Sequence, residues 1–146
     1  MGGDIIIKGL VLQINSQSLK KFEAALEQVQ IKMQQNAGVG LENAGKNILE
    51  YSNQLVPVDT GALRSSASVT KSFSNQSEVK TFIGYGDQQI ANPKTGRLTS
   101  EYAVEVHENL EAQYKKGKTP KFLEIAALSK ATQEFQTTVA NALKRL

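Results

Sequence analysis

The chain has 146 residues, which is the length of about one domain. It contains no Cys and one His, His107, so disulfides, thiolate metal sites and cysteine nucleophiles are excluded together. The formal net charge of +3 comes from Lys and Arg spread along the sequence, whereas nucleic-acid binding driven by counterion release needs a clustered cationic surface.

No apolar run approaches the roughly 20 residues that a membrane-spanning helix needs. The first residues, Met1 to Asp4, lack the basic start of a signal peptide. We therefore expect a soluble chain that is neither exported nor bound to a membrane. The absence of Cys suits assembly in a reducing cytoplasm.

The composition indicates one modest core. Trp is absent, aromatic residues make up 6% of the chain, and the hydrophobic share of 40% is below that of average globular domains. We infer a single domain over residues 1–146 whose stability is completed by partner subunits.

Residues 1–14 are predicted to form an N-terminal strand or arm. The run from Ile5 to Ile14 is rich in β-branched residues, and Gly9 marks a bulge or bend. Because the run is apolar on both faces, it lies either inside the core or under another chain. A core strand and an intersubunit contact are therefore both open.

A first helix is predicted after Asn15 to Ser18, which supply N-cap candidates. Its apolar residues recur at alternating spacings of three and four: Leu19, Phe22, Leu26, Val29 and Met33. We expect this stripe to face inward. Asn36 to Gly38 ends or kinks the helix, or else Gly38 to Gly40 is a bend in a longer one.

A second helix is predicted from Leu41 to Leu55, again with apolar residues at helical spacing. Gly45 lies on this stripe, where the lack of a Cβ would allow another element to approach closely. Pro57 has no amide hydrogen and biases Val56 away from the helical region, so the helix must end here. Residues 56–66 therefore read as an architectural joint.

The joint starts the next element at once. Asp59 or Thr60 can cap a new turn with a side-chain oxygen, and Gly61 permits a tight bend or a close approach. We expect Leu63 to point into the core and Arg64 to point outward. The joint contains no nucleophile beside a base, no phosphate loop and no cluster of metal ligands.

An antiparallel hairpin is predicted after the joint. Residues 66–73 and 79–85 both alternate, and residues 74–77 supply turn chemistry. Ala67 and Val69 are expected on one face, together with Val79, Thr81 and Ile83 of the second strand.

Two loops carry most of the candidate cations. Residues 86–100 form the longest stretch without a periodic pattern, and residues 111–119 form a basic loop around Gly117. Their cations are candidates to face DNA or a neighbouring subunit: Lys94, Arg97, Lys115, Lys116 and Lys118.

Residues 102–108 fit either a short helix with Tyr102, Ala103 and Val106 inward, or a strand. His107 and Glu108 are expected to make structural hydrogen bonds or to face a partner. A mononuclear metal site usually needs three or four ligands, and the chain has no second His. We therefore predict no catalytic residues, no metal and no cofactor.

A long C-terminal helix is predicted to start near Pro120, where a missing amide costs little, and to cover the hairpin. Phe122 and Leu123 open its apolar face. The predicted class is α+β: a small antiparallel β-sheet packed by an N-terminal helical pair and a long C-terminal helix.

Three of these stretches together resemble one family. Pro57 to Ser66 (PVDTGALRSS), Tyr102 to Glu108 (YAVEVHE) and Lys121 to Ala126 (KFLEIA) look like the motifs of head-tail joining proteins from the neck of long-tailed bacteriophages, often labelled minor capsid or tail-completion proteins. The resemblance covers roughly residues 40–146. The chain departs from it in having Asn109-Leu110 where many members have Gly soon after the second motif.

The resemblance implies a structural virion protein rather than an enzyme. Copies of the chain would assemble in the host cytoplasm into a ring, expected to be sixfold, in the virion neck between the portal or connector and the tail. Other neck, connector and tail proteins would be its partners, and genomic DNA would pass through the lumen without being read. The alternatives are a tail terminator ring on the tail tube and a small nucleic-acid-binding module.

Overall fold

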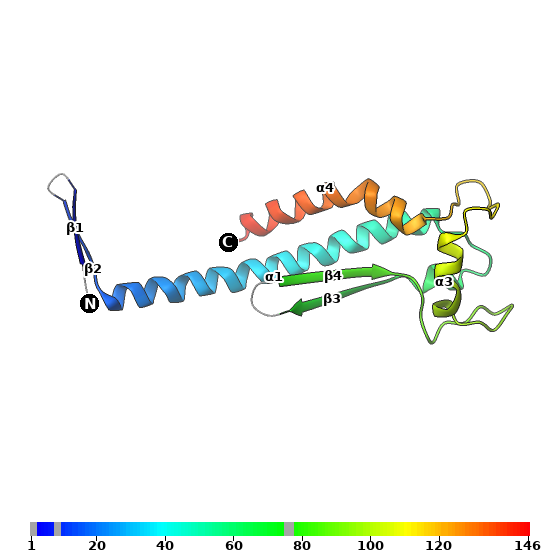
Figure 1. Ribbon diagram of the computed structural model, residues 1–146, viewed down its shortest axis with the longest axis horizontal. Coiled ribbons are helices and arrows are strands. Elements are labelled where there is room, and N and C mark those ends of the chain that lie inside the picture. Colours follow the sequence, from blue (N-terminus) through cyan, green and yellow to red (C-terminus); the bar gives the residue numbers. More distant parts are fainter. Residues whose placement is uncertain (1–2, 8–9, 75–77) are drawn as a thin grey trace.

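The computed structural model describes residues 3–7, 10–74 and 78–146. The chain is elongated, with a small hairpin at one end and a cluster of short elements at the other (Figure 1). Among the described residues, no helix is both long enough and apolar enough to cross a membrane. The elements in chain order are β1 (Gly3–Ile7), β2 (Leu10–Ile14), α1 (Ser16–Leu55), α2 (Ala62–Ser65), β3 (Ser68–Ser74), β4 (Glu78–Gly84), α3 (Thr99–Glu108) and α4 (Phe122–Lys144).

The α+β class is confirmed, but the predicted pair of N-terminal helices is one continuous helix, α1, of 40 residues. Asn15 caps it, since its side-chain oxygen accepts a bond of 2.8 Å from the Ser18 amide, and Pro57 follows its C-cap as expected. Neither Gly38 nor Gly40 ends the helix, and Gly40 lies where α4 packs. A Cβ at Gly40 would stand 2.6 Å from Cγ2 of Thr138. Gly40 therefore serves close packing within the helix.

The second hairpin, β3 with β4, is antiparallel as predicted, with Val69 opposite Ile83. Its inner face lies on α1 at Gly45, where an added Cβ would come within 2.9 Å of Ile83 and 3.2 Å of both Thr81 and Val69. The close approach expected at Gly45 is therefore confirmed. Of the turn predicted at 74–77, residues 75–77 lie outside the described residues.

Helix α4 runs antiparallel along α1, and α1 lies between α4 and the β3–β4 hairpin (Figure 1). The Asn47 side chain donates to Glu134 at 3.0 Å, and Lys32 donates to the carbonyl of Leu146 at 3.1 Å. The helix begins at Phe122, two residues after the Pro120 near which its start was predicted, because Lys121 takes the left-handed region at φ 57°. The long helix α1 thus separates α4 from the hairpin, so α4 covers α1 and not the hairpin that it was predicted to cover.

The apolar stripe in the first half of α1 is exposed, so the expectation that it faces inward is wrong. Exposed fractions run from 38% at Met33 to 60% at Phe22. Helix α4 covers this side of α1 further along, but it ends opposite Lys32. The reason is therefore length, since α1 extends well beyond the C-terminus of the helix packed on it.

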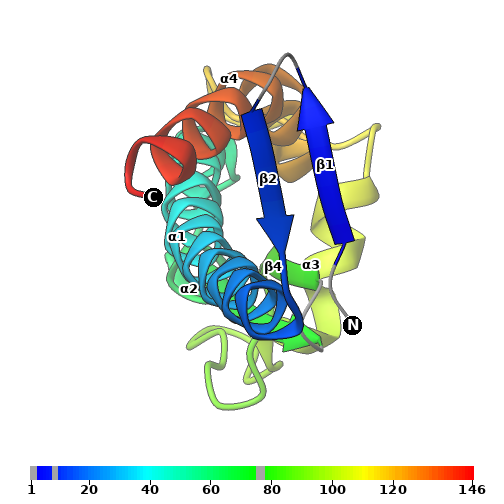
Figure 2. The same cartoon turned by 90° about the vertical axis from the view of Figure 1, so that its left-hand side faces the viewer.

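Strands β1 and β2 form an antiparallel hairpin of their own, pairing Gly3 with Ile14 and Ile7 with Leu10. The single strand predicted over Ile5 to Ile14 is therefore two strands, and they form a sheet separate from β3–β4. Figure 2, viewed from this end, shows the hairpin in front of α1 and α4. The predicted bulge at Gly9 lies outside the described residues.

A test of the α1–hairpin contact is the Gly45→Leu variant. Because the introduced side chain would overlap three side chains of the hairpin, we expect the free energy of unfolding to fall by about 1–3 kcal/mol or more. Lys46→Leu introduces the same side chain at the exposed neighbouring position, with an expected change of about 0.5 kcal/mol or less. Urea denaturation at fixed protein concentration measures both, and equal stability of the two variants would contradict the contact.

Candidate functional site

The three motifs, far apart in the sequence, meet in one core at the end of the molecule where α1 stops. Phe122 is 1% exposed and Val56 is fully buried, and both pack with Leu63, Tyr102 and Ala103. One residue of this cluster lies just after α1, and the others come from α2, α3 and α4. This motif core therefore ties the joint to both later motifs.

Two aromatic side chains stand edge-on against Phe122. Its ring centroid lies 5.0 Å from that of Tyr85 and 4.9 Å from that of His107, both in T-shaped arrangements. Such pairs stabilise by roughly 0.5–1.5 kcal/mol beyond their buried area. Leu123, the neighbouring motif residue, is partly buried and packs against the same core. His107 thus serves packing around Phe122.

At the joint, Gly61 makes the tight bend expected, and Thr60 rather than Asp59 supplies the side-chain oxygen predicted for the new turn. Gly61 has φ 87°, a left-handed conformation that favours glycine, and it precedes α2. The Thr60 hydroxyl accepts a bond of 3.3 Å from the Ala62 amide. Asp59 does not cap the turn, because its carboxylate pairs with Lys94 of the 86–100 loop. Asp59 therefore links the joint to a distant loop.

Leu63 and Arg64 point as expected. Leu63 is 6% exposed within the motif core, whereas Arg64 is exposed. The two side chains point in these directions because both residues lie in the short helix α2, which has one face on the core.

Two hydroxyl residues that the sequence did not single out hold the loop after β4. The buried Ser66 hydroxyl donates to the carbonyl of Leu63 at 2.6 Å and accepts from the amide of Gly86 at 2.9 Å. The fully buried Thr99 hydroxyl accepts from the amide of Asp87 at 2.7 Å and donates to its carbonyl at 3.0 Å. Both hydroxyls therefore satisfy backbone groups next to the core.

A third unpredicted contact joins the hairpin to α1. The Tyr85 hydroxyl lies 2.9 Å from the Ser52 hydroxyl and 2.8 Å from Oδ1 of Asn53. Burial raises the pKa of Tyr85 above its usual value. Tyr85 thereby anchors the end of β4 on α1 while its ring packs on Phe122.

The second and third motifs are joined by an ionic network. Glu108 bonds to Nδ1 of His107 at 2.7 Å and pairs with Lys121, which also lies 3.3 Å from Glu124. The Lys121 amide donates to the carbonyl of His107 at 2.7 Å. The bonds from Lys121 and then His107 lower the pKa of Glu108, and the bond to Glu108 raises that of Lys121.

Asn109, which stands where many of the resembling proteins have Gly, turns the chain with its side chain. Its Oδ1 accepts bonds of 3.2 Å and 3.1 Å from the amides of Glu111 and Ala112. Its φ of −76° is open to any residue, so no glycine is needed. The loop then returns to α1, where the Thr119 amide donates to the carbonyl of Leu55 at 3.0 Å.

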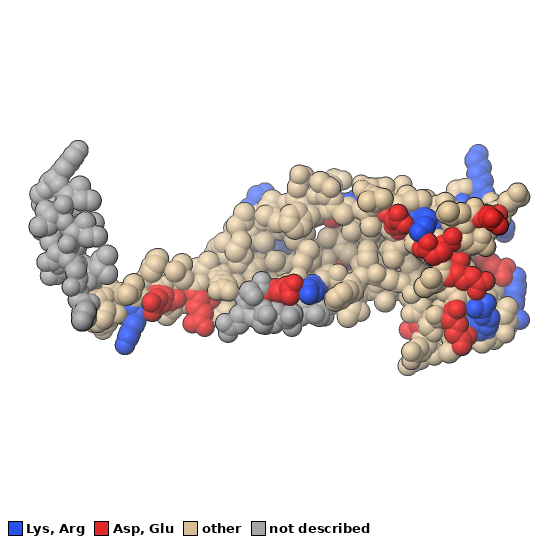
Figure 3. Space-filling model, in the orientation of Figure 1, with Lys and Arg blue, Asp and Glu red and all other residues tan. Residues whose placement is uncertain are grey.

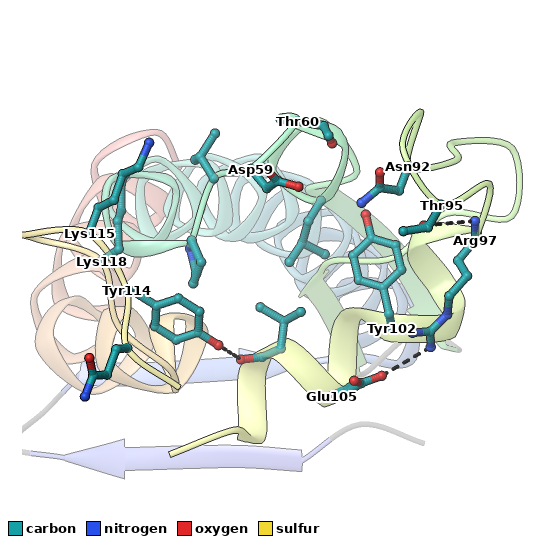
Figure 4. A pocket seen from close by; sticks show the side chains of 16 residues that line it. Asp59, Thr60, Asn92, Thr95, Arg97, Tyr102, Glu105, Tyr114, Lys115 and Lys118 are labelled. Carbon is teal, nitrogen blue, oxygen red and sulfur yellow. Dashed lines mark hydrogen bonds and ion pairs between the residues drawn. The ribbon is translucent and has the colours of Figure 1, made fainter. Parts of the chain in front are cut away.

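A cavity of about 460 Å³ opens beside the motif core, between the joint, α3 and the two cation-bearing loops (Figure 4). Its walls combine apolar side chains of the joint and α3 with the rings of Tyr102 and Tyr114. The Tyr114 hydroxyl donates to the carbonyl of Val106 at 3.2 Å, which fixes one wall. The polar and charged side chains around it are Asp59, Thr60, Asn92, Thr95, Arg97, Glu105, Gln113, Lys115 and Lys118.

The predicted cations fall into two groups. Lys94 is paired with Asp59, and Arg97 lies 3.2 Å from Glu105 with its guanidinium 5.7 Å from the centre of the Tyr102 ring. Lys115 and Lys118 line the cavity, where the Lys118 ammonium donates to the carbonyl of Gln54 at 2.8 Å. Lys116 is exposed outside the cavity lining. The five cations thus do not form one uncompensated patch.

Chemically, the cavity presents apolar walls and a rim of both charge signs (Figure 4), at an end of the molecule where Figure 3 shows acidic and basic side chains close together. Within residues 3–7, 10–74 and 78–146, no three His, Asp or Glu side chains are grouped so that they could hold a metal ion. Mixed polar rims around apolar centres are typical of surfaces that contact other proteins. The arrangement therefore suits protein contact at this end of the molecule.

Comparison of the chain with protein-family models, with curated protein sequences and with solved structures finds no match. The resemblance to phage neck proteins therefore stands on the three motifs themselves.

A test of the motif core compares two adjacent residues. We expect Leu63→Ala to lower the free energy of unfolding by about 2–5 kcal/mol, since a buried leucine leaves a cavity. Arg64→Ala removes an exposed side chain and should change it by about 0.5 kcal/mol or less. Denaturant melts of both variants measure the difference, and a Leu63→Ala protein as stable as the wild type would refute the burial.

The network around Glu108 predicts a pH dependence. Because its pKa is lowered from the usual 4.5, the stabilisation is fully present above about pH 4.5 and is lost as the pH falls through the lowered value. The melting temperature of Glu108→Gln should therefore lie below that of the wild type at pH 7, and the two should converge in acid. Glu50→Gln, at an exposed position of α1, serves as the control. A gap that widens in acid would contradict this assignment.

Proposed function

We propose that the chain is a structural protein of the neck of a long-tailed bacteriophage. Copies of it form a ring that joins the DNA-filled head to the tail and lets the genome pass. The observation that carries this proposal is the convergence of the three motifs on one core, with the cavity beside it. Motifs that meet in this way act as one architectural unit.

The roles of the motif residues support an architectural rather than a chemical function. Leu63, Tyr102 and Phe122 fill the core, Gly61 makes the turn, and Glu108 pairs with Lys121. Each of these contacts holds one segment of the chain against another. The set therefore fixes the shape of this end of the subunit, which is what docking to other neck, connector and tail proteins requires.

The charges favour this proposal over a nucleic-acid-binding module. Lys94 and Arg97 each have a carboxylate partner within the chain, so part of their charge is already compensated. Contact with passing DNA needs no sequence reading and only weak attraction, whereas a binding module gains its affinity from many uncompensated cations. The proposed ring is therefore a conduit for DNA and does not retain it.

Electron microscopy of the purified full-length chain, alone and with the portal and tail proteins encoded by neighbouring genes, tests the proposal. We expect closed rings with a central opening wide enough for double-stranded DNA, and binding to at least one of those neighbours. Retention on immobilised DNA should be weak and independent of sequence. The proposal would be overturned if the chain formed no ring under either condition and its gene had no portal or tail genes beside it.

A further inference from the structure

Two helix faces of the chain carry rows of large apolar side chains that are exposed. The α1 stripe consists of Leu19, Phe22, Leu26, Val29 and Met33. The α4 stripe consists of Leu128, Phe135, Val139 and Leu143, and Leu128 is 79% exposed. Single exposed apolar residues are ordinary, but contiguous rows of them mark interaction surfaces.

The α1 stripe continues the seam on which the chain's own α4 packs. The alternating spacing of three and four residues that ends at Met33 goes on through Asn36, Gly40 and Asn47. At these positions α4 is in place: Asn36 donates to the carbonyl of Ala142 at 3.4 Å, and Asn47 donates to Glu134 at 3.0 Å. The seam therefore keeps the residue spacing that helix packing requires along its whole length, and α4 covers one part of it.

The α4 stripe lies on a face without charged side chains. Between Ile125 and Leu143 the only charged residues are Lys130 and Glu134. Both turn toward α1, where Lys130 lies 5.2 Å from the centre of the Tyr51 ring and Glu134 accepts from Asn47. On the side of the molecule that Figure 3 shows, the surface along α4 is mostly tan. Depletion of charge is the compositional mark of the centre of a protein interface.

The accessible surface of the chain is larger than that of a compact monomer of the same mass. Its accessible surface is 10299 Å², whereas a compact monomer of 15.9 kDa would expose about 7,400 Å². The excess is on the order of 3,000 Å², and a standard interface takes roughly 800 Å² from each partner. The elongated chain therefore leaves uncovered more area than one interface of ordinary size takes from a partner.

We propose that the α1 stripe of one copy packs on the α4 stripe of the next copy. The lengths agree: Leu19 to Met33 spans about 21 Å of helix and Leu128 to Leu143 about 22 Å, at 1.5 Å per residue. A twofold contact between two α1 stripes would leave the α4 stripe in water. One head-to-tail contact covers both stripes, and such contacts close into rings. The inference rests on the proposed function in that a ring needs two different faces on each subunit.

Engineered cysteines test this contact without background, because the chain contains no Cys. Leu26→Cys and Phe135→Cys place thiols near the middle of the two stripes, so that they meet whichever way the helices run. We expect an intermolecular disulfide when the two variants are mixed and oxidised, and at least tenfold less when either is oxidised alone. Phe135→Cys mixed with Gln28→Cys, on the opposite side of α1, is the matched control.

Association is measured in parallel by sedimentation of the full-length chain. Leu26→Asp should weaken self-association at least tenfold, while Gln28→Asp should leave it unchanged, and far-ultraviolet circular dichroism checks that both remain folded. Cross-linking of Leu26→Cys with itself, or unchanged association of Leu26→Asp, would overturn the inference. If microscopy shows rings but the mixed disulfide does not form, the contact between the two stripes is refuted and the proposed neck function is not. The mixed disulfide in open filaments would support it while refuting the neck function.

Discussion

The burial of Phe122 is the contact on which the rest of this structure depends. Its ring is packed among Val56, Leu63 and Tyr102, with the rings of Tyr85 and His107 edge-on around it. Through it the end of α1, the joint, the hairpin, α3 and the start of α4 are held together. Because the Phe122 backbone follows the left-handed Lys121, whose amide bonds to His107, the direction of α4 along α1 is set at the same point.

Local sequence patterns were sufficient for the α+β class, for the β3–β4 hairpin and for the end of α1 at Pro57. These features follow from backbone chemistry and from alternation, which are visible within a few residues. The inward Leu63, the outward Arg64 and the close approach at Gly45 were also predictable from the sequence. Each of these depends on one element having one buried face.

Contacts between distant residues account for what the sequence did not reveal. The end or kink expected near Asn36 to Gly38 does not occur, and packing of Gly40 with α4 offsets its low helix propensity. Asp59 fits a cap, but Lys94, 35 residues later, takes its carboxylate. The roles of Ser66, the last residue of the first motif, and of Thr99 do not show in the sequence, because their hydroxyls bond backbone groups that only the fold brings near. The apolar stripe of α1 was visible, but whether its own chain covers it depends on where α4 ends.

The two close-packed glycines of α1 restrict more than their own neighbours. Gly40 meets α4 and Gly45 meets the hairpin, and five residues of helix place them about 140° apart around its axis. The middle of α1 is therefore packed on two sides. Rotation of α1 about its axis, or translation along it, would open one of the two contacts. The uncovered N-terminal part of α1 continues the same helix, so its direction is fixed by these two contacts.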